Sequence, residues 1–432
     1  MGVCMEMGVD ELEGHWLGVT AVLAIAAKLL ATFRYAGSGL PISTDSLMLQ
    51  HPGWYMLNGA TLYSDFVEVK PPVVYETTAL LSVVTGNNPI AIHVLGMVIT
   101  QLAVVLSSVG IALIVHYKTS SPVAAVAAGV SLYALPATID FGWGGFLAKP
   151  FAVMFGIYGI YFLLRDLPLF AGLLSALSAA YWQPSLIFSA IIIGMAVRSR
   201  RKRRVLRVIG GGIVAVVVVL GPVVIWRAID QMLLSVFVIP SVASGSTTFI
   251  QTLHGVAGGL GYGGFVVLIG GVGVLIAASA GDLWPIAGAG WGVLQVFVLD
   301  YDAGSDLFVG MAFAAIGVGF AVSETRGRWQ QATVLVLALT VVISGISGGW
   351  LGLVAPIQGP PNDTLHESQS GSIPPEMGSG GVESMHTVFW DQRTPKSCYY
   401  TAAASGDLRS WLKVTGQPID RNTCPGASEF WQ

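Results

Sequence analysis

The residues best suited to chemistry lie in one stretch of the chain, from about residue 37 to residue 88. It combines carboxylates, one lysine and aromatic rings, namely Asp45, Asp65, Glu68, Lys70 and Glu76 with His51, Trp54, Tyr55, Tyr63 and Tyr75. A carboxylate can act as a general base toward a hydroxyl group, and partial desolvation can tune its pKa toward neutrality. Aromatic rings can stack on sugar rings, and a lysine can neutralise a departing phosphate. The stretch therefore suits sugar transfer from a phosphate, and the alternative is a set of solvated loop charges.

Four further polar residues stand apart from this stretch. Lys149, in the segment FGWGGFLAKPF, is a second candidate for a phosphate, or a lysine that snorkels at a membrane edge. Asp302 lies with Asp300 and Asp306 in LDYDAGSDLF, which is typical of a polar turn, and binding of acceptor hydroxyls is the alternative. Gln183 either shapes the same face or makes an interhelical hydrogen bond. Lys28 lies within an apolar run, where charges are costly and often functional, and is a candidate for meeting a lipid phosphate.

The elements that must position these residues are membrane helices. Only 10% of the 432 residues are charged and 54% are hydrophobic, which excludes a soluble enzyme and a disordered protein. The net charge of -3 argues against binding to nucleic acid. The sequence predicts an all-α polytopic bundle of about eleven transmembrane helices. They are expected over roughly 16–36, 89–117, 122–140, 150–164, 167–182, 184–197, 205–226, 255–280, 283–300, 306–322 and 332–354.

Basic residues predict the orientation of this bundle. The run from Arg198 to Arg207 should be cytoplasmic, which places the N-terminus inside, the C-terminus outside and the 37–88 loop outside. Within that loop we expect a short helix from Leu47 to Leu62, broken at first by Pro52, and a surface helix from Val73 to Val84. The protein should therefore be a multi-pass cell-membrane protein whose active site faces outward.

The chain divides into three predicted regions. Residues 1–354 form the transmembrane catalytic domain, residues 355–384 read as a linker, and residues 385–432 read as a small outer module. Cys398 and Cys424 lie in this module and could form one disulfide bond. Asn362 begins a sequence that fits N-glycosylation on the same side of the membrane.

An ordered series of short motifs in the loop resembles the GT-C superfamily of polyprenyl-phosphate-sugar glycosyltransferases. The series is Asp45-Ser46, Gly53-Trp54, Asn58-Gly59, Tyr63-Ser-Asp65, Glu68-Val-Lys70-Pro71-Pro72 and Tyr75. Within the superfamily, the chain most resembles haloarchaeal dolichyl-phosphate-mannose mannosyltransferases of N-glycosylation. That likeness rests on Gln50-His51-x-Gly53-Trp54-Tyr55, Lys149-Pro150-Phe151, Trp182-Gln183-Pro184 and the Cys-bearing aromatic tail.

The resemblance implies a role for each candidate. Asp45 would be the general base, and Asp65 and Glu68 would orient it or bind the acceptor. The donor phosphate would be held by Lys70, Lys149 and His93, the last standing where many relatives have Arg. Sugar or acceptor contacts would come from His51, Trp54, Tyr55, Gln183 and Asp302. The resemblance implies no metal and no cofactor. One departure is that many relatives have an Asp-Glu pair where this chain has Asp45-Ser46.

The predicted function is transfer of mannose, with inversion, from dolichyl-phosphate-mannose to a lipid- or protein-linked glycan at the outer face. A lipid-linked sugar flippase or other transporter is the main alternative, although a transporter should place polar groups near the middle of the bilayer. A transferase for another sugar or for a protein hydroxyl, and a membrane anchor for the tail, also stay open. For Asp45 the structural alternative is the N-cap of a helix.

Overall fold

The chain folds into a bundle of helices. The computed structural model describes residues 3–35, 42–66, 68–238, 240, 249–299 and 304–347. Over these residues every regular element is helical, and one isolated bridge joins Leu62 to Phe66. The predicted all-α membrane fold is confirmed.

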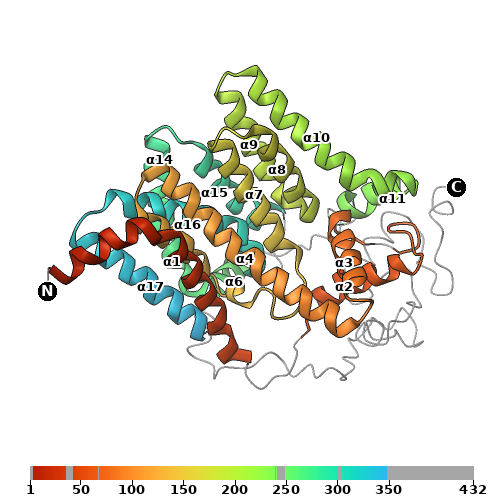
Figure 1. Ribbon diagram of the computed structural model, residues 1–432, viewed down its shortest axis with the longest axis horizontal. Coiled ribbons are helices and arrows are strands. Elements are labelled where there is room, and N and C mark those ends of the chain that lie inside the picture. The colour runs from red at the N-terminus through yellow and green to blue at the C-terminus, as the bar shows by residue number, and fades with distance from the viewer. Residues whose placement is uncertain are drawn as a thin grey trace.

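Six helical segments are long and apolar enough to cross a membrane within the described part of the chain. They are α1 (Val3–Tyr35), α4 (Pro89–Thr119), α10 (Lys202–Ile225), α13 (Phe249–Leu260) continued through η4 (Gly261–Gly263) into α14 (Gly264–Ser279), η6 (Gly304–Leu307) with α16 (Phe308–Glu324), and α17 (Arg328–Ser347). α1 and α17 lie together on one side of the bundle, and α10 lies on the opposite side (Figure 1). The predicted eleven crossings and the orientation stay predictions.

Shorter apolar helices fill the bundle between these segments. They are α5 (Pro122–Ser131), η1 (Leu132–Ala134), α6 (Pro136–Asp140), α7 (Ala148–Leu164), α8 (Pro168–Tyr181), η2 (Gln183–Ser185), α9 (Leu186–Arg198), α11 (Ile229–Leu233), η3 (Leu234–Val238), α15 (Trp284–Leu294) and η5 (Gln295–Leu299). Several of the helices begin with proline, whose fixed φ suits the first helical turn. Each apolar run predicted from the sequence contains helix in the structure.

Small residues allow the helices to approach closely. A Cβ added at Gly273 of α14 would lie 1.7 Å from the carbonyl oxygen of Gly317 in α16. A Cβ at Gly172 of α8 would lie 1.8 Å from the carbonyl oxygen of Val208 in α10. Such backbone contact is how helices associate in lipid, where apolar side chains gain little from leaving the solvent.

The predicted outer loop contains two helices, α2 (Thr44–Leu57) and α3 (Pro72–Val84). The second matches its prediction, but the predicted Leu47–Leu62 helix with a break at Pro52 is wrong. Ser43 caps α2, so the helix begins at Thr44, and it continues through Pro52. It ends before Gly59, whose φ of +96° favours glycine and stops the helix.

Candidate active site

Asp45 lies in the first turn of α2 with its side chain exposed. The helix cap is Ser43, whose Oγ accepts a hydrogen bond from the backbone N–H of Ser46 (3.2 Å). The capping role considered for Asp45 from the sequence therefore belongs to Ser43. A negative charge in the first turn also interacts favourably with the helix dipole.

A glycine-rich segment, residues 141–147, packs against the start of α2. Its Gly144 carbonyl accepts from the backbone N–H of Ser43 (3.0 Å), and its Phe146 carbonyl accepts from Ser46 Oγ (3.1 Å). Gly145 has a φ of +111°, and a Cβ there would lie 2.8 Å from the Cβ of Ser46. The segment therefore touches α2 on both sides of Asp45, and glycine is required for that approach.

Two histidines predicted to bind substrate are buried, His51 within α2 and His93 beside it. His93 of α4 is 0% exposed, and its Nδ1 lies 3.5 Å from Gln50 Nε2. His51 is 2% exposed, and its ring lies 5.2 Å from the ring of Trp54 in a tilted arrangement. Trp54 and Tyr55 are only partly buried. The aromatic rings are therefore the more accessible members of this group.

The turn that carries Asp65 is held by its own hydrogen bonds. Asp65 Oδ2 accepts from the backbone N–H of Thr61 (2.6 Å), and the Asp65 N–H donates to the Thr61 carbonyl (2.9 Å). Tyr63, between them, adopts a φ of +67°. One oxygen of the Asp65 carboxylate thus stabilises a local turn.

Glu68, two residues before Lys70 in the chain, is buried in the interior. It is 1% exposed, and its Oε2 accepts from the Tyr75 hydroxyl (2.9 Å). The Tyr63 hydroxyl donates to the Lys70 carbonyl (2.6 Å). Burial, and then the negative charge of Glu68, raise the pKa of both tyrosine hydroxyls well above its usual value. Both tyrosines therefore stay protonated and hold the backbone that presents Lys70.

An apolar groove begins at the two prolines that follow Lys70 in the chain. It has a volume of about 230 Å³ and runs between α8, α10, α11 and η3, with Pro71 and Pro72 in its wall. Gln183 also lines it, and its Nε2 donates to the carbonyls of Val69 (2.8 Å) and Val236 (3.0 Å). Gln183 therefore ties the Lys70 backbone to the groove.

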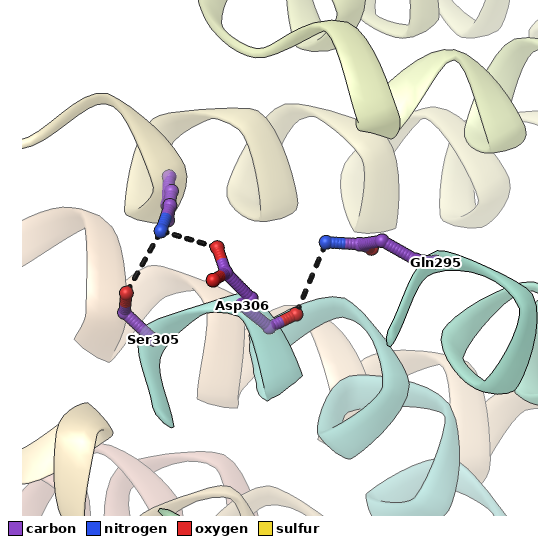
Figure 2. Close-up of polar contacts among 4 residues, drawn as sticks. Gln295, Ser305 and Asp306 are labelled. Atoms are coloured by element: carbon purple, nitrogen blue, oxygen red, sulfur yellow. Dashed lines mark hydrogen bonds and ion pairs between the residues drawn. The ribbon is translucent and has the colours of Figure 1, made fainter. Parts of the chain in front are cut away.

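Lys149 forms an ion pair in a separate polar cluster with Asp306, Ser305 and Gln295. Its Nζ lies 2.5 Å from Asp306 Oδ1 and 2.8 Å from Ser305 Oγ, and it lies 5.3 Å from the centre of the Trp182 ring. Figure 2 shows this cluster, in which Gln295 donates from Nε2 to the Asp306 carbonyl (3.3 Å). The side chains of Lys149 and Asp306 are 20% and 12% exposed. The Lys149 charge is therefore largely neutralised by the protein itself.

The structure links several predicted residues through intermediaries that sequence reasoning missed. Residues 141–149 run from the start of α2 to Lys149, and Trp182-Gln183 continues the contacts to Val69 beside Lys70. Sequence reasoning did not predict the contacts made by Ser43, Ser46, Gln50, Ser305 and Asp306, although Ser46 and Gln50 lie in the quoted motifs and Asp306 lies in the acidic turn. Asp302, Asn362, Cys398, Cys424 and the predicted linker and tail module lie outside the described residues.

Comparison with known proteins bears on the enzyme class and the fold of this chain. Residues 59–220 match the family model described as DolP-mannose mannosyltransferase. This match supports the family resemblance found in the sequence. The matched range includes Asp65, Glu68, Lys70, Lys149 and Gln183, and it begins after Asp45.

A similar curated protein is the dolichol phosphate-mannose mannosyltransferase of Haloferax volcanii. It is 25% identical over 93% of this chain and 96% of its own length. The predicted enzyme class, a dolichyl-phosphate-mannose-dependent mannosyltransferase, is thereby confirmed, as is the likeness to haloarchaeal members.

Among solved structures, the chain is similar to ArnT from Cupriavidus metallidurans bound to undecaprenyl phosphate. The TM-score is 0.55 at 13% sequence identity, over 75% of this chain and 63% of the ArnT chain. At that identity the likeness shows the fold alone, so the helical architecture of this chain is similar to that of ArnT.

Proposed function

We propose that the chain transfers mannose from dolichyl-phosphate-mannose to a glycan on a lipid or protein at the outer membrane face. Asp45 removes the proton from the acceptor hydroxyl as that oxygen attacks the anomeric carbon. The bond between that carbon and the phosphate oxygen breaks, and dolichyl phosphate leaves from the opposite side. Configuration at the anomeric carbon is therefore inverted, and the proton resides on Asp45 until it passes to water.

The observation that carries the proposal is the apolar groove beginning at Pro71 and Pro72, directly after Lys70. A polyprenyl phosphate is a long apolar chain with an anionic end. Its binding site therefore needs an apolar groove next to a positive charge. The groove wall is formed by small and apolar side chains from α8 and α10, with Gln183 as its polar member. Such a surface suits a prenyl chain better than a free sugar nucleotide.

The three phosphate ligands predicted from the sequence differ in accessibility, and we assign the phosphate mainly to Lys70. Lys70 is partly buried, and its backbone is held by Tyr63. Lys149 shares its charge with Asp306, so its contribution to the phosphate is secondary. His93 is fully buried next to Gln50 of α2, so we assign it to packing against that helix and not to the phosphate. Asp65 and Glu68 stabilise the backbone between Asp45 and Lys70.

The orientation follows from the same proposal. With about eleven crossings, the N-terminus inside and the C-terminus outside, α2 and α3 lie at the outer face of the cell membrane. The basic run from Arg198 to Arg207 supports this orientation, since basic residues concentrate on the inner side.

The test uses the full chain purified in detergent with dolichyl-phosphate-mannose and a lipid-linked glycan. Mass spectrometry should show a gain of one hexose with the native protein and almost none with Asp45→Asn. Asp282→Asn is the matched control, since Asp282 pairs with Lys118 at 2.6 Å and bears on another part of the molecule. The control should keep full activity.

A second variant tests the phosphate assignment. Lys70→Met should raise the KM for the donor by about 10- to 100-fold, because one charge-assisted hydrogen bond contributes about 1.5–3 kcal/mol. Equal activity in Asp45→Asn and native protein would remove Asp45 as the base. Donor binding without any product in native protein would favour a lipid-linked sugar transporter.

A further inference from the structure

Lys28 is a buried lysine in α1, 17 residues before Asp45 in the chain. It is 3% exposed although it lies within the membrane-spanning segment Gly14–Ala31. Its ammonium group has three N–H donors. Three backbone carbonyls accept them, those of Thr138 (3.2 Å), Ile139 (2.6 Å) and Phe141. These contacts leave no donor for the lipid phosphate expected from the sequence.

The three carbonyls cluster at the end of α6, a helix of only five residues. Carbonyls in the last turn of a helix lack partners within the helix, and they carry the negative end of its dipole. A lysine amine among them satisfies these groups and offsets the cost of burying its own charge. Lys28 thereby fixes the point at which α6 ends and residues 141–147 begin.

Residues 141–147 lead directly from this point to the start of α2. The Gly144 carbonyl binds the N–H of Ser43, and the Phe146 carbonyl binds the hydroxyl of Ser46. A Cβ at Gly142 would lie 3.0 Å from the backbone N of Gln101 in α4. The segment is therefore enclosed between α1, α2 and α4, so a displacement at Lys28 passes to the turn that carries Asp45.

We propose that Lys28 is a positioning residue for Asp45. By binding the end of α6, Lys28 determines the position of residues 141–147 between the helices. These residues in turn determine the position of the first turn of α2. The inference rests on the proposed role of Asp45 as the general base. Lys28 makes no contact with substrate, and its effect reaches the reaction only through the position of the Asp45 carboxylate.

The consequence is a change in turnover rather than in binding. A displacement of a catalytic group by about 1 Å can cost on the order of 100-fold in rate. Lys28→Met removes the charge and all three donors while keeping an unbranched side chain. We expect its kcat to fall by about 10- to 100-fold, with the KM for dolichyl-phosphate-mannose within about 3-fold of native. The donor groove at Pro71 and Pro72 is held by other contacts, notably those of Gln183.

The deciding experiment is a four-protein cycle of native, Lys28→Met, Asp45→Glu and the double variant, assayed for hexose transfer. Asp45→Glu keeps a carboxylate that is already displaced by one methylene, so its residual rate should be measurable. If Lys28 acts through Asp45, the double variant loses less rate than the product of the two single losses. A fully multiplicative loss, or an unchanged kcat in Lys28→Met, would overturn the proposal. Native activity in Asp45→Glu together with Asp45→Asn would instead reject the base assignment.

Two further variants protect the result against unfolding. Lys28→Gln keeps two N–H donors and should give an intermediate kcat, and it decides by the same criteria if Lys28→Met does not fold. Lys118→Met removes another lysine and its ion pair with Asp282, and it should leave kcat and KM unchanged. A loss of kcat in Lys118→Met as large as that in Lys28→Met would show that any lost lysine slows the enzyme, and would overturn the proposal.

Discussion

The first turns of α2 and α7 carry opposite charges at equivalent positions, but only one of the two charges has an ion-pair partner within the protein. Asp45 lies in the first turn of α2, where its charge suits the helix dipole, and Ser43 provides the cap. Lys149 lies in the first turn of α7, where a cation opposes the dipole, and Asp306 neutralises it. The Asp45 carboxylate stays exposed, whereas the Lys149 ammonium group is paired with Asp306. A charged residue beside a predicted site is therefore informative only once its partner is known.

The strongest test of this comparison neutralises each charge in turn. Asp45→Asn should lower kcat by on the order of 100- to 10,000-fold, the range expected for loss of a general base. Lys149→Met should lower kcat by less than about 10-fold, because its charge is already balanced by Asp306. Single-turnover rates at saturating donor measure both. Losses of similar size would break the comparison and make Lys149 a phosphate ligand of equal importance.

The next test moves the support of α2 without touching a charge. Gly145→Ala should lower kcat by about 10-fold or more, since an alanine at this φ is strained by about 1–3 kcal/mol and its Cβ meets Ser46 and Gln50. Gly210→Ala is the matched control, because a Cβ there meets nothing within 4 Å in α10. The control should be as active and at least as stable as native protein. Native activity in Gly145→Ala would show that residues 141–147 do not set the position of α2.

A smaller effect should appear in the stability of the Lys149–Asp306 pair. Lys149→Met and Asp306→Asn should each lower the free energy of unfolding by about 2 kcal/mol, because each leaves one partly buried polar group without its partner. The double variant should lose less than the sum of the two. Thermal unfolding in detergent measures this cycle.

The Lys118–Asp282 pair provides the contrast for that cycle. Its side chains are 24% and 26% exposed, so removal of either partner should cost less than about 1 kcal/mol. A larger loss at this pair than at Lys149–Asp306 would mean that burial is not what separates them.

The last test concerns Glu76 of α3, a carboxylate whose pKa is raised by burial and not by a charged partner. Burial raises its pKa from 4.5 to about 7, and its Oε1 has no hydrogen-bond partner among the described residues. The folded state therefore keeps a proton that the unfolded state has already lost, so stability falls as pH rises from about 4.5 to 7. Glu76→Gln should remove this part of the pH dependence of the melting temperature. An unchanged pH profile would contradict the assignment.

Part of the site could be predicted because it is local. The stretch from Asp45 to Tyr75 is recognisable from residue types and order, and the second loop helix follows from Pro71-Pro72 and the apolar residues after them. The start of α2 was placed three residues late, since Ser43 and Asp45 are both good caps and sequence alone does not choose between them. The predicted break at Pro52 is absent, because Gly53 packs closely against Thr78 of α3 and α2 continues through this point.

By itself, the sequence determined the class of the molecule: its composition requires membrane helices, and its ordered loop motifs indicate the sugar transferase. Tertiary structure decided which charges remain available. Lys149 and Asp306 are 157 residues apart, and Lys28 meets carbonyls more than 100 residues away. Membrane helices and helix caps can be predicted from local sequence, because hydropathy and capping act over one or two helical turns. Pairing of buried charges depends on which helices become neighbours, so only the packed bundle could assign Lys149 to Asp306 and leave Asp45 exposed.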